Sequence, residues 1–218
     1  MKAFVSWSGG KDSCLALYRG LAAGYRINAL FCMLHEGGKY SRSHGLPREL
    51  FAAQARAMGL PISFACSTWE GYEEAFKEGV EELRRKGVRA GIFGDIDLAE
   101  HREWVERISD ELGILPLLPL WGENRRKLVE EFIDLGFRAL VVSVRKDCLL
   151  GDWLGRTLDR EILEEMERAG IDPAGENGEF HTFVYAGPLF REPVRYRLVG
   201  EAKRGDHLQA VLQGRQGK

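Results

Sequence analysis

The stretch Ser8-Gly9-Gly10-Lys11-Asp12-Ser13 decides the fold, because of what flanks it on each side. The apolar-rich residues 2–7 before it are typical of a strand, and the apolar pattern that begins at Cys14 is typical of a helix. The sequence therefore predicts a strand, a tight glycine turn and a helix N-terminus. The first N–H groups of a helix lack internal partners and its dipole is positive there, so such an end binds anions, phosphate chains above all.

All the residue types in this turn except the aspartate suit a phosphate chain. Gly9 and Gly10 let the backbone approach the oxygens without a Cβ in the way. The remaining donors are two hydroxyls and one ammonium group, on Ser8, Ser13 and Lys11. Asp12 would repel phosphate, so we expect its carboxylate to hold a magnesium ion or to cap the helix from within its first turn. A glycine turn with an ordinary cap is the simpler alternative.

The turn is not a Walker A loop, which needs Gly-x-x-x-x-Gly-Lys-Ser/Thr, because Asp12 follows Lys11 and the upstream glycine is missing. It resembles instead the PP-loop of the N-type ATP pyrophosphatases. That resemblance implies cleavage of ATP between its α- and β-phosphates. It also implies adenylation of a carbonyl or carboxylate oxygen, followed by displacement of AMP by an amine or sulfur nucleophile.

Length and composition are those of an ordinary globular protein. The 218 residues are 44% apolar and 29% charged, and the chain is long enough to bury a sizeable core. A formal net charge of −2 gives no general attraction to nucleic acid or to anionic membranes. No apolar run reaches transmembrane length and no signal-peptide pattern opens the chain, so we expect a cytoplasmic location and no membrane partner. The scattered cysteines indicate buried thiols in a reducing compartment: Cys14, Cys32, Cys66 and Cys148.

Apolar runs and helical patterns alternate over about the first 145 residues, which predicts an α/β fold with a parallel five-stranded sheet and helices on both faces. The strand-like runs are residues 2–7, 27–34, 62–66, 91–93 and 138–144. Residues 115–122, with two prolines, are expected to form a rigid connection. Later in the chain, residues 196–211 indicate a hairpin. We therefore expect a PP-loop ATP-binding domain over residues 1–145 and a smaller α+β acceptor-binding domain over residues 146–218.

Two segments that follow predicted strands are expected at the ligand site, since open parallel sheets bind ligands beyond the carboxyl ends of their strands. The first, residues 35–45, is a glycine-rich loop that contains His44 and would cover the nucleotide or the acceptor; a loop without function is the alternative. The second contains Gly94 and Asp95, whose carboxylate is a candidate contact for magnesium or the acceptor, or else a loop cap. His101 on the next helix could face the same crevice, although a lone helical histidine is more often incidental.

A second polar cluster lies at residues 175–182, which read GENGEFHT. Glu176 and Glu179 could hold magnesium or position an amine. His181 could act as a general base, since its unperturbed pKa lies near the working pH. A turn capped by its own side chains explains the same pattern, and the residues alone leave both interpretations open.

Several motifs, in this order along nearly the whole chain, resemble the diphthine–ammonia ligase-like family. They are residues 8–13, Gly94-Asp95-Ile96, Pro119-Leu120-Trp121, residues 152–156 (DWLGR) and residues 175–182. The resemblance implies a HUP-type sheet followed by a smaller domain that helps to form the acceptor site. It also implies an ATP-dependent amidation, in which diphthine on elongation factor 2, ammonia and ATP give diphthamide, AMP and pyrophosphate.

The resemblance assigns roles to candidate site residues. The phosphates of ATP are expected on residues 8–13, with the adenine against backbone groups near Met33 and with Gly94 close by. Asp12 would help to place Mg²⁺, and one of Glu176, Glu179 and His181 would take the proton from ammonia. The expected acceptor contacts are His44, Asp95, His101, Asn177, Gly178 and Thr182.

Two departures from the family pattern bear on the acceptor. The eukaryotic and archaeal diphthine enzymes carry Glu-Gly-Gly-Glu-Tyr/Phe-Glu-Thr, where this chain has Asn177 and His181 at the second and second-last positions. They also place a Gln and an Arg where this chain has His101 and Trp104. A small-molecule carboxylate such as a corrinoid is therefore an alternative acceptor, and a non-catalytic ATP or AMP sensor is an alternative function. No cysteine lies in a recognisable glutaminase setting, so free ammonia is the expected nitrogen source. The sequence leaves open whether two copies of the chain form a homodimer.

Overall fold

Five parallel strands form the first sheet of the computed structural model, which describes residues 1–42, 44–148 and 151–214. The strand order is β3-β2-β1-β4-β5, and all four pairings are parallel. The strands are β1 (Lys2–Ser6), β2 (Arg26–His35), β3 (Ile62–Ser67), β4 (Ala90–Ile92) and β5 (Leu115–Leu117). The predicted α/β fold with a parallel five-stranded sheet is confirmed.

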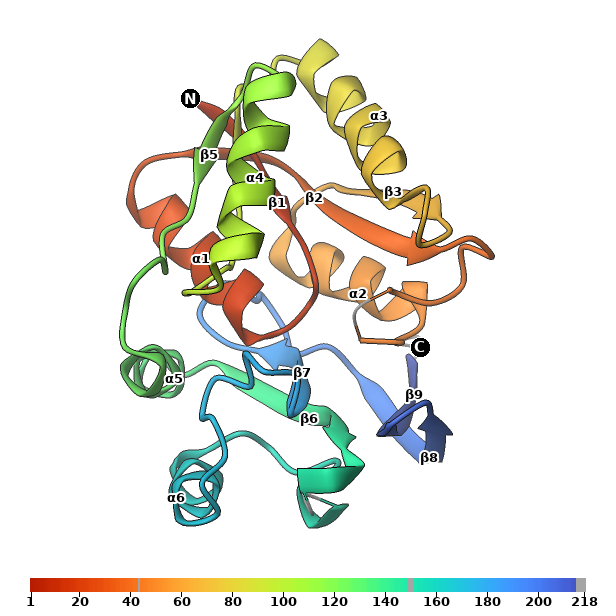
Figure 1. The fold of residues 1–218 in the computed structure, drawn as a ribbon, viewed down its shortest axis with the longest axis vertical. Helices are drawn as coiled ribbons and strands as arrows, with labels where there is room; N and C mark the ends of the chain where they lie inside the picture. The colour runs from red at the N-terminus through yellow and green to blue at the C-terminus, as the bar shows by residue number, and fades with distance from the viewer. Residues whose placement is uncertain (43, 149–150, 215–218) are drawn as a thin grey trace.

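Helices cover both faces of this sheet, as predicted (Figure 1). They are α1 (Lys11–Ala22) and α2 (Arg48–Met58) on one face, and α3 (Tyr72–Arg85) and α4 (Ala99–Glu111) on the other. Side chains alternate along a strand, so Ala3 and Val5 pack in the core with α1 and α2, whereas Phe4 packs with α3 and α4. This two-sided burial explains why the buried central residues of β1 and β2 are all apolar.

The identity of the fifth strand was predicted wrongly. Residues 138–144 belong to β6 (Arg138–Arg145), which lies in a second sheet, and β5 takes the fifth place in the first sheet. A buried antiparallel strand covered on both faces has the same continuous apolar pattern as a parallel one. The short β5 was missed because Pro116 suggests a connection. Proline is tolerated there because β5 is an edge strand, on which a missing N–H can face away from the ladder.

The second sheet is antiparallel, with the order β7-β6-β9-β8. Its other strands are β7 (Phe180–Ala186), β8 (Tyr196–Arg204) and β9 (His207–Gly214), and its helices are α5 (Arg125–Asp134) and α6 (Arg160–Arg168). The predicted smaller α+β unit and its terminal hairpin are confirmed. Short 3₁₀ turns follow β6 at Lys146–Cys148 and Gly151–Trp153.

The two sheets meet through α1 and α2, which lie between the first sheet and the second unit (Figure 1). One hydrophobic core joins them, since Val5, Leu15 and Phe51 belong to the same buried cluster as Val141 and Phe183. The expected boundary at residue 145 would put β6 with the first sheet, although β6 pairs with β7 and β9. We therefore propose a boundary between β5 and α5.

The cysteines are only partly as expected. Cys14 and Cys32 are buried free thiols, and burial raises the pKa of each. Cys66 is exposed and Cys148 is partly exposed, so the prediction of a buried thiol is wrong for these two. None of the helices in the described residues is both long enough and apolar enough to span a bilayer.

Candidate functional site

The predicted phosphate turn joins β1 to α1, as expected from its flanks. Gly10 is the N-cap residue of α1 and offers no side-chain cap. The turn is closed by its own hydroxyls: Ser8 Oγ accepts from Gly10 N at 3.3 Å and donates to Ser13 Oγ at 3.1 Å, and Ser13 Oγ donates to the Gly10 carbonyl at 3.1 Å. The result is a preformed helix N-terminus, which suits an anion.

Glycines are needed here because the turn is held from two sides. Gly9 has φ +76°, and a Cβ on it would lie 2.6 Å from Phe51 Cε1 and 2.8 Å from Gln54 Oε1 on α2. A Cβ on Gly94, in the loop after β4, would lie 2.9 Å from both Asp12 C and Ser13 N. Gly94 therefore packs directly against the start of α1.

Gln54 holds the turn in place, and sequence reasoning missed it. This fully buried side chain donates from Nε2 to the carbonyls of Gly9 at 2.9 Å and Val184 at 2.7 Å, and it accepts from Trp7 Nε1 at 2.9 Å. The Gly9 carbonyl also accepts from Val184 N at 3.0 Å, so the turn pairs with the edge of β7. The available signal was a glutamine on the apolar face of α2, because a buried polar side chain must find partners.

Gln54→Leu should lower the free energy of unfolding by about 2 to 3 kcal/mol and weaken ATP binding, because it leaves Trp7 Nε1 and the Val184 carbonyl without this buried partner. Urea unfolding followed by Trp fluorescence, with ATP binding by calorimetry, measures both effects. Gln213→Leu makes the same chemical change at an exposed position of β9 and serves as the control. Equal stability of the two variants would contradict this role for Gln54.

A crevice of about 270 Å³ opens at this turn, between the carboxyl edge of the first sheet and the second unit. The predicted site residues that line it are Ser8, Lys11, Asp12, Ser13, His44, Gly94, Asp95, His101, Glu176, Gly178, His181 and Thr182. Thr182 also touches the turn directly, since its Oγ1 accepts from Lys11 N at 3.0 Å. The fold thus brings together residues from four separate segments of the chain.

Other predicted site residues lie outside the crevice lining. Gly9 and Gly10 form the backbone of the turn but are not among the residues that line the crevice. Met33 packs its side chain in the core with Phe4, and its carbonyl accepts from Arg42 N at 3.2 Å. The adenine contact expected near Met33 stays a prediction.

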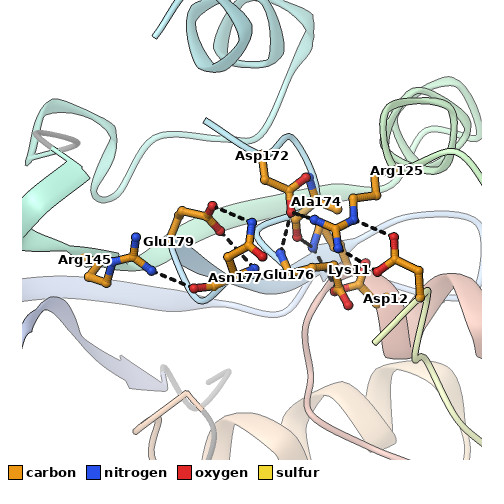
Figure 2. Close-up of polar contacts among 10 residues, drawn as sticks. Lys11, Asp12, Arg125, Arg145, Asp172, Ala174, Glu176, Asn177 and Glu179 are labelled. Carbon is orange, nitrogen blue, oxygen red and sulfur yellow. Dashed lines mark hydrogen bonds and ion pairs between the residues drawn. The ribbon is translucent and has the colours of Figure 1, made fainter. Parts of the chain in front are cut away.

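Glu179 and Asn177 bond to each other rather than facing the crevice (Figure 2). Glu179 is buried, and its two carboxylate oxygens each accept at 3.1 Å, from Asn177 N and Asn177 Nδ2. Arg145 Nη1 donates to the Asn177 carbonyl at 2.6 Å. This pair shapes the loop before β7. Of the two glutamates in the motif, Glu176 is the one that lines the crevice.

Lys11 links the turn to the second unit. Its buried ammonium group donates to Asp12 Oδ2 at 2.8 Å and to the Ala174 carbonyl (Figure 2). The same ammonium group lies 5.4 Å from the centroid of the Phe180 ring. A phosphate bound at the start of α1 would therefore meet a cation already held at the same helix end.

Three carboxylates share the crevice with this single ammonium group. Burial, together with the charge of Asp12, raises the pKa of Glu176 to about 7, against the opposing effect of Lys11 and Arg125. Burial also raises the pKa of Asp12, although the Lys11 ammonium opposes the shift. A hydrogen bond to Asp95 at 3.2 Å raises the pKa of His101. Glu176 is therefore poised to exchange a proton near neutral pH.

Two histidines of the crevice, His44 and His181, are neutral at pH 7. Burial, with the neighbouring His207 and Lys11, lowers the pKa of His181 to about 4, and burial lowers the pKa of His44 well below its usual range. Their rings lie 4.7 Å apart, and His181 lies 5.9 Å from His207, which sequence reasoning did not single out. A pKa this low makes His181 a weak base at pH 7, so the electrostatics favour Glu176 as the proton acceptor.

The crevice can hold magnesium that is bound to the phosphate oxygens of a nucleotide, but within the part of the chain that the structure describes it has no metal site made of protein ligands alone. The described residues contain no group of three or more His, Cys, Asp or Glu side chains arranged to hold a metal ion. Magnesium that arrives on phosphate oxygens needs only one or two carboxylates, however, and it keeps several waters. Asp12 and Asp95 both line the crevice and can supply them.

Two family models match the chain, described as the diphthamide synthase N-terminal domain (residues 1–116) and C-terminal domain (residues 124–212). Their junction agrees with the boundary proposed from strand pairing. A solved structure, a predicted subunit of tRNA methyltransferase from Methanocaldococcus jannaschii, is 17% identical with a TM-score of 0.49, covering 86% of this chain and 98% of that one.

Curated relatives carry a consistent name. The diphthine–ammonia ligase of Homo sapiens is 29% identical over 220 residues, covering 89% of this chain and 82% of the human protein. The protein of the same name from Danio rerio is 30% identical over 217 residues, covering 86% of this chain and 83% of its own. With both family models matched in order along the sequence, the chain belongs to the diphthamide synthase family.

Proposed function

We propose that the chain is an ATP-dependent amide ligase, which adenylates an acceptor carboxylate, releases pyrophosphate, and transfers ammonia with release of AMP. The observation that carries this proposal is the shared crevice. A helix N-terminus built for phosphate and a carboxyl group with a pKa of about 7 face the same 270 Å³ space. The family and the names of the curated relatives support a carbon–nitrogen ligase.

In the first step, the triphosphate lies on residues 8–13. An oxygen of the acceptor carboxylate attacks the α-phosphorus, and the bond from that phosphorus to pyrophosphate breaks. Lys11 and the N–H groups at the start of α1 stabilise the charge that grows on the leaving pyrophosphate. Asp12 and Asp95 would hold magnesium, which when bound neutralises phosphate charge.

In the second step, the nitrogen of ammonia attacks the acyl carbon of the adenylate, and the bond to AMP breaks. Glu176 accepts the proton that the new amide nitrogen loses. It suits this task because at neutral pH a large fraction of it is deprotonated, yet it binds a proton readily. Free ammonia is the nitrogen source in this scheme.

The names of the relatives favour diphthine as the acceptor. The resemblance described above implies that this diphthine lies on elongation factor 2. One observation keeps a small-molecule carboxylate, such as a corrinoid, as the second candidate. His181 lines the crevice as a neutral side chain where the family pattern has a carboxylate. This wall of the crevice therefore lacks a negative charge that the diphthine enzymes have. A cytoplasmic location and a homodimer also belong to the proposal.

Acceptor-dependent AMP release tests the function. The protein is incubated with ATP, ammonium and either diphthine-bearing elongation factor 2 or a corrinoid carboxylate, and nucleotides and pyrophosphate are quantified. We expect AMP and pyrophosphate in equal amounts, with the amide on one acceptor only. Formation of ADP would indicate a different ATPase, and tight ATP binding without products would indicate a sensor; either result rejects the ligase.

A further inference from the structure

Arg125 joins the two halves of the crevice from outside it. It is the first residue of α5, and its guanidinium group holds two carboxylates at once. Nε and Nη2 donate to the two oxygens of Asp97 at 2.7 and 2.6 Å. Nη1 donates to Asp172 Oδ2 at 2.7 Å (Figure 2). A cation in the first turn of a helix opposes the helix dipole, so its presence there needs another explanation.

Asp172 organises the turn that carries Glu176. Its nearly buried carboxylate accepts from Ala174 N at 3.0 Å and from Glu176 N at 2.8 Å, in addition to Arg125. The same turn supplies the Ala174 carbonyl that accepts from Lys11 Nζ. The positions of the Glu176 backbone and of the Lys11 ammonium group therefore both depend on this turn.

Asp97 belongs to the loop that forms the opposite wall of the crevice, although its own side chain does not line it. It lies two residues after Asp95, in the loop that begins with Gly94 against the start of α1. A hydrogen bond of 2.7 Å from Gly122 N to the Ile96 carbonyl ties the same loop towards α5. Arg125 thus fixes the loop of Asp95, which follows β4 of the first sheet, relative to the turn of Glu176, which precedes β7 of the second sheet.

We infer that Arg125 is a positioning residue of the ligase, which sets the placement of Glu176 against the phosphate-binding turn through Asp172 and Asp97. The inference rests on the proposed function and deepens it. A bidentate arginine suits this task because its planar fork fixes direction as well as distance, and its charge offsets the buried Asp172. Loss of the bridge would let the Glu176 turn shift by a fraction of an ångström while the phosphate turn, held by Gln54, stays in place.

The main test compares Arg125→Gln with Arg125→Lys. Arg125→Gln should lower kcat for acceptor-dependent AMP formation by about 10- to 100-fold, because small displacements of reacting groups cost this much, with KM for ATP changed by no more than about twofold. Arg125→Lys keeps the charge and one contact, so it should recover part of the lost kcat. Hydrogen exchange at the amides of Ala174 and Glu176, measured without nucleotide or acceptor, should be faster in Arg125→Gln.

Arg107→Gln is the matched control. Arg107 also holds two carboxylates, since it bonds both oxygens of Glu73 at 3.0 and 2.6 Å and Glu111 at 2.9 Å, but it lies on α4 away from the crevice lining. Its loss also takes one arginine away from two carboxylates, at a more exposed position, without touching the Glu176 turn. It should leave kcat and the exchange of Ala174 and Glu176 as in the wild type.

The outcomes separate the two levels of the argument. Equal kcat in Arg125→Gln and Arg107→Gln, or unchanged exchange at Ala174 and Glu176 in Arg125→Gln, would overturn the positioning role. A wild type that forms no acceptor-dependent AMP would reject the proposed function. The exchange comparison would then still decide whether Arg125 holds the turn.

Discussion

Lys11→Ala is expected to lower the rate of acceptor-dependent AMP formation by about 100-fold or more, because it removes a preorganised donor to the charge that grows on pyrophosphate. The ammonium group is buried at the start of α1 and bonds Asp12 and the Ala174 carbonyl, so it is already placed before nucleotide arrives. Release of pyrophosphate, followed by a coupled colorimetric assay, measures the effect directly.

A matched variant separates this effect from a general loss of charge. Lys77 on α3 also pairs with two carboxylates, Glu73 at 2.9 Å and Glu111 at 2.6 Å, and none of the three lines the crevice. Lys77→Ala should form AMP at the wild-type rate. Lys11→Met keeps a long buried side chain but removes its charge, so it should be as inactive as Lys11→Ala while melting close to the wild type. A normal AMP yield from either Lys11 variant would refute the role assigned to Lys11.

The phosphate turn could be predicted from sequence because its signal is local. Strand, glycine turn and helix are adjacent, and the residues proposed to bind phosphate lie on that one turn. The same is true of residues 175–182, where Glu176, His181 and Thr182 follow one another onto β7. Each motif lies on one short segment, so its residues stay together whatever the rest of the fold does. Most residues of the two motifs therefore line the same crevice.

The choice of sheet for β5 and β6 could not be predicted in the same way. Both runs are apolar, and hydrophobic pattern reports burial but not the partner strand. Pro116 also argued against a strand at β5, because a proline is acceptable there only when the strand lies at the edge of the sheet. Strand pairing is a long-range property, and a single sequence carries little information about it.

Long-range contacts also explain the site residues that were missed. Gln54 meets Gly9 and Val184 from positions 45 and 130 residues away, and Arg125 meets Asp172 from 47 residues away. Glu176 and Glu179 look equivalent in sequence, yet only the folded loop turns one into the crevice and the other onto Asn177. Residue type suggested the chemistry, and tertiary structure selected which residue can perform it.

Glu176→Gln is expected to lower kcat by about 100-fold or more and to abolish the acidic limb of the pH profile, because the amide cannot accept a proton. In the wild type, kcat/KM should rise with pH through about 7, the value to which burial and Asp12 bring the pKa of Glu176. Ammonium also loses a proton as pH rises, so the free ammonia concentration is held constant. Glu179→Gln should leave the acidic limb in place, since the Glu179 carboxylate is bonded to Asn177.

Stability should change in the opposite direction from activity in this variant. Because the folded-state pKa of Glu176 is raised above the ordinary value of 4.5, its contribution to stability is full at low pH and is lost as pH rises through about 7. A glutamine stays neutral, so Glu176→Gln should melt at or above the wild-type temperature at pH 8 and lose this part of the pH dependence.

A triphosphate adds negative charge to the crevice, so the acidic limb of kcat should lie at higher pH than that of kcat/KM. An acidic limb that persists unchanged in Glu176→Gln would assign the proton to another group, and His181 would then be the next to replace.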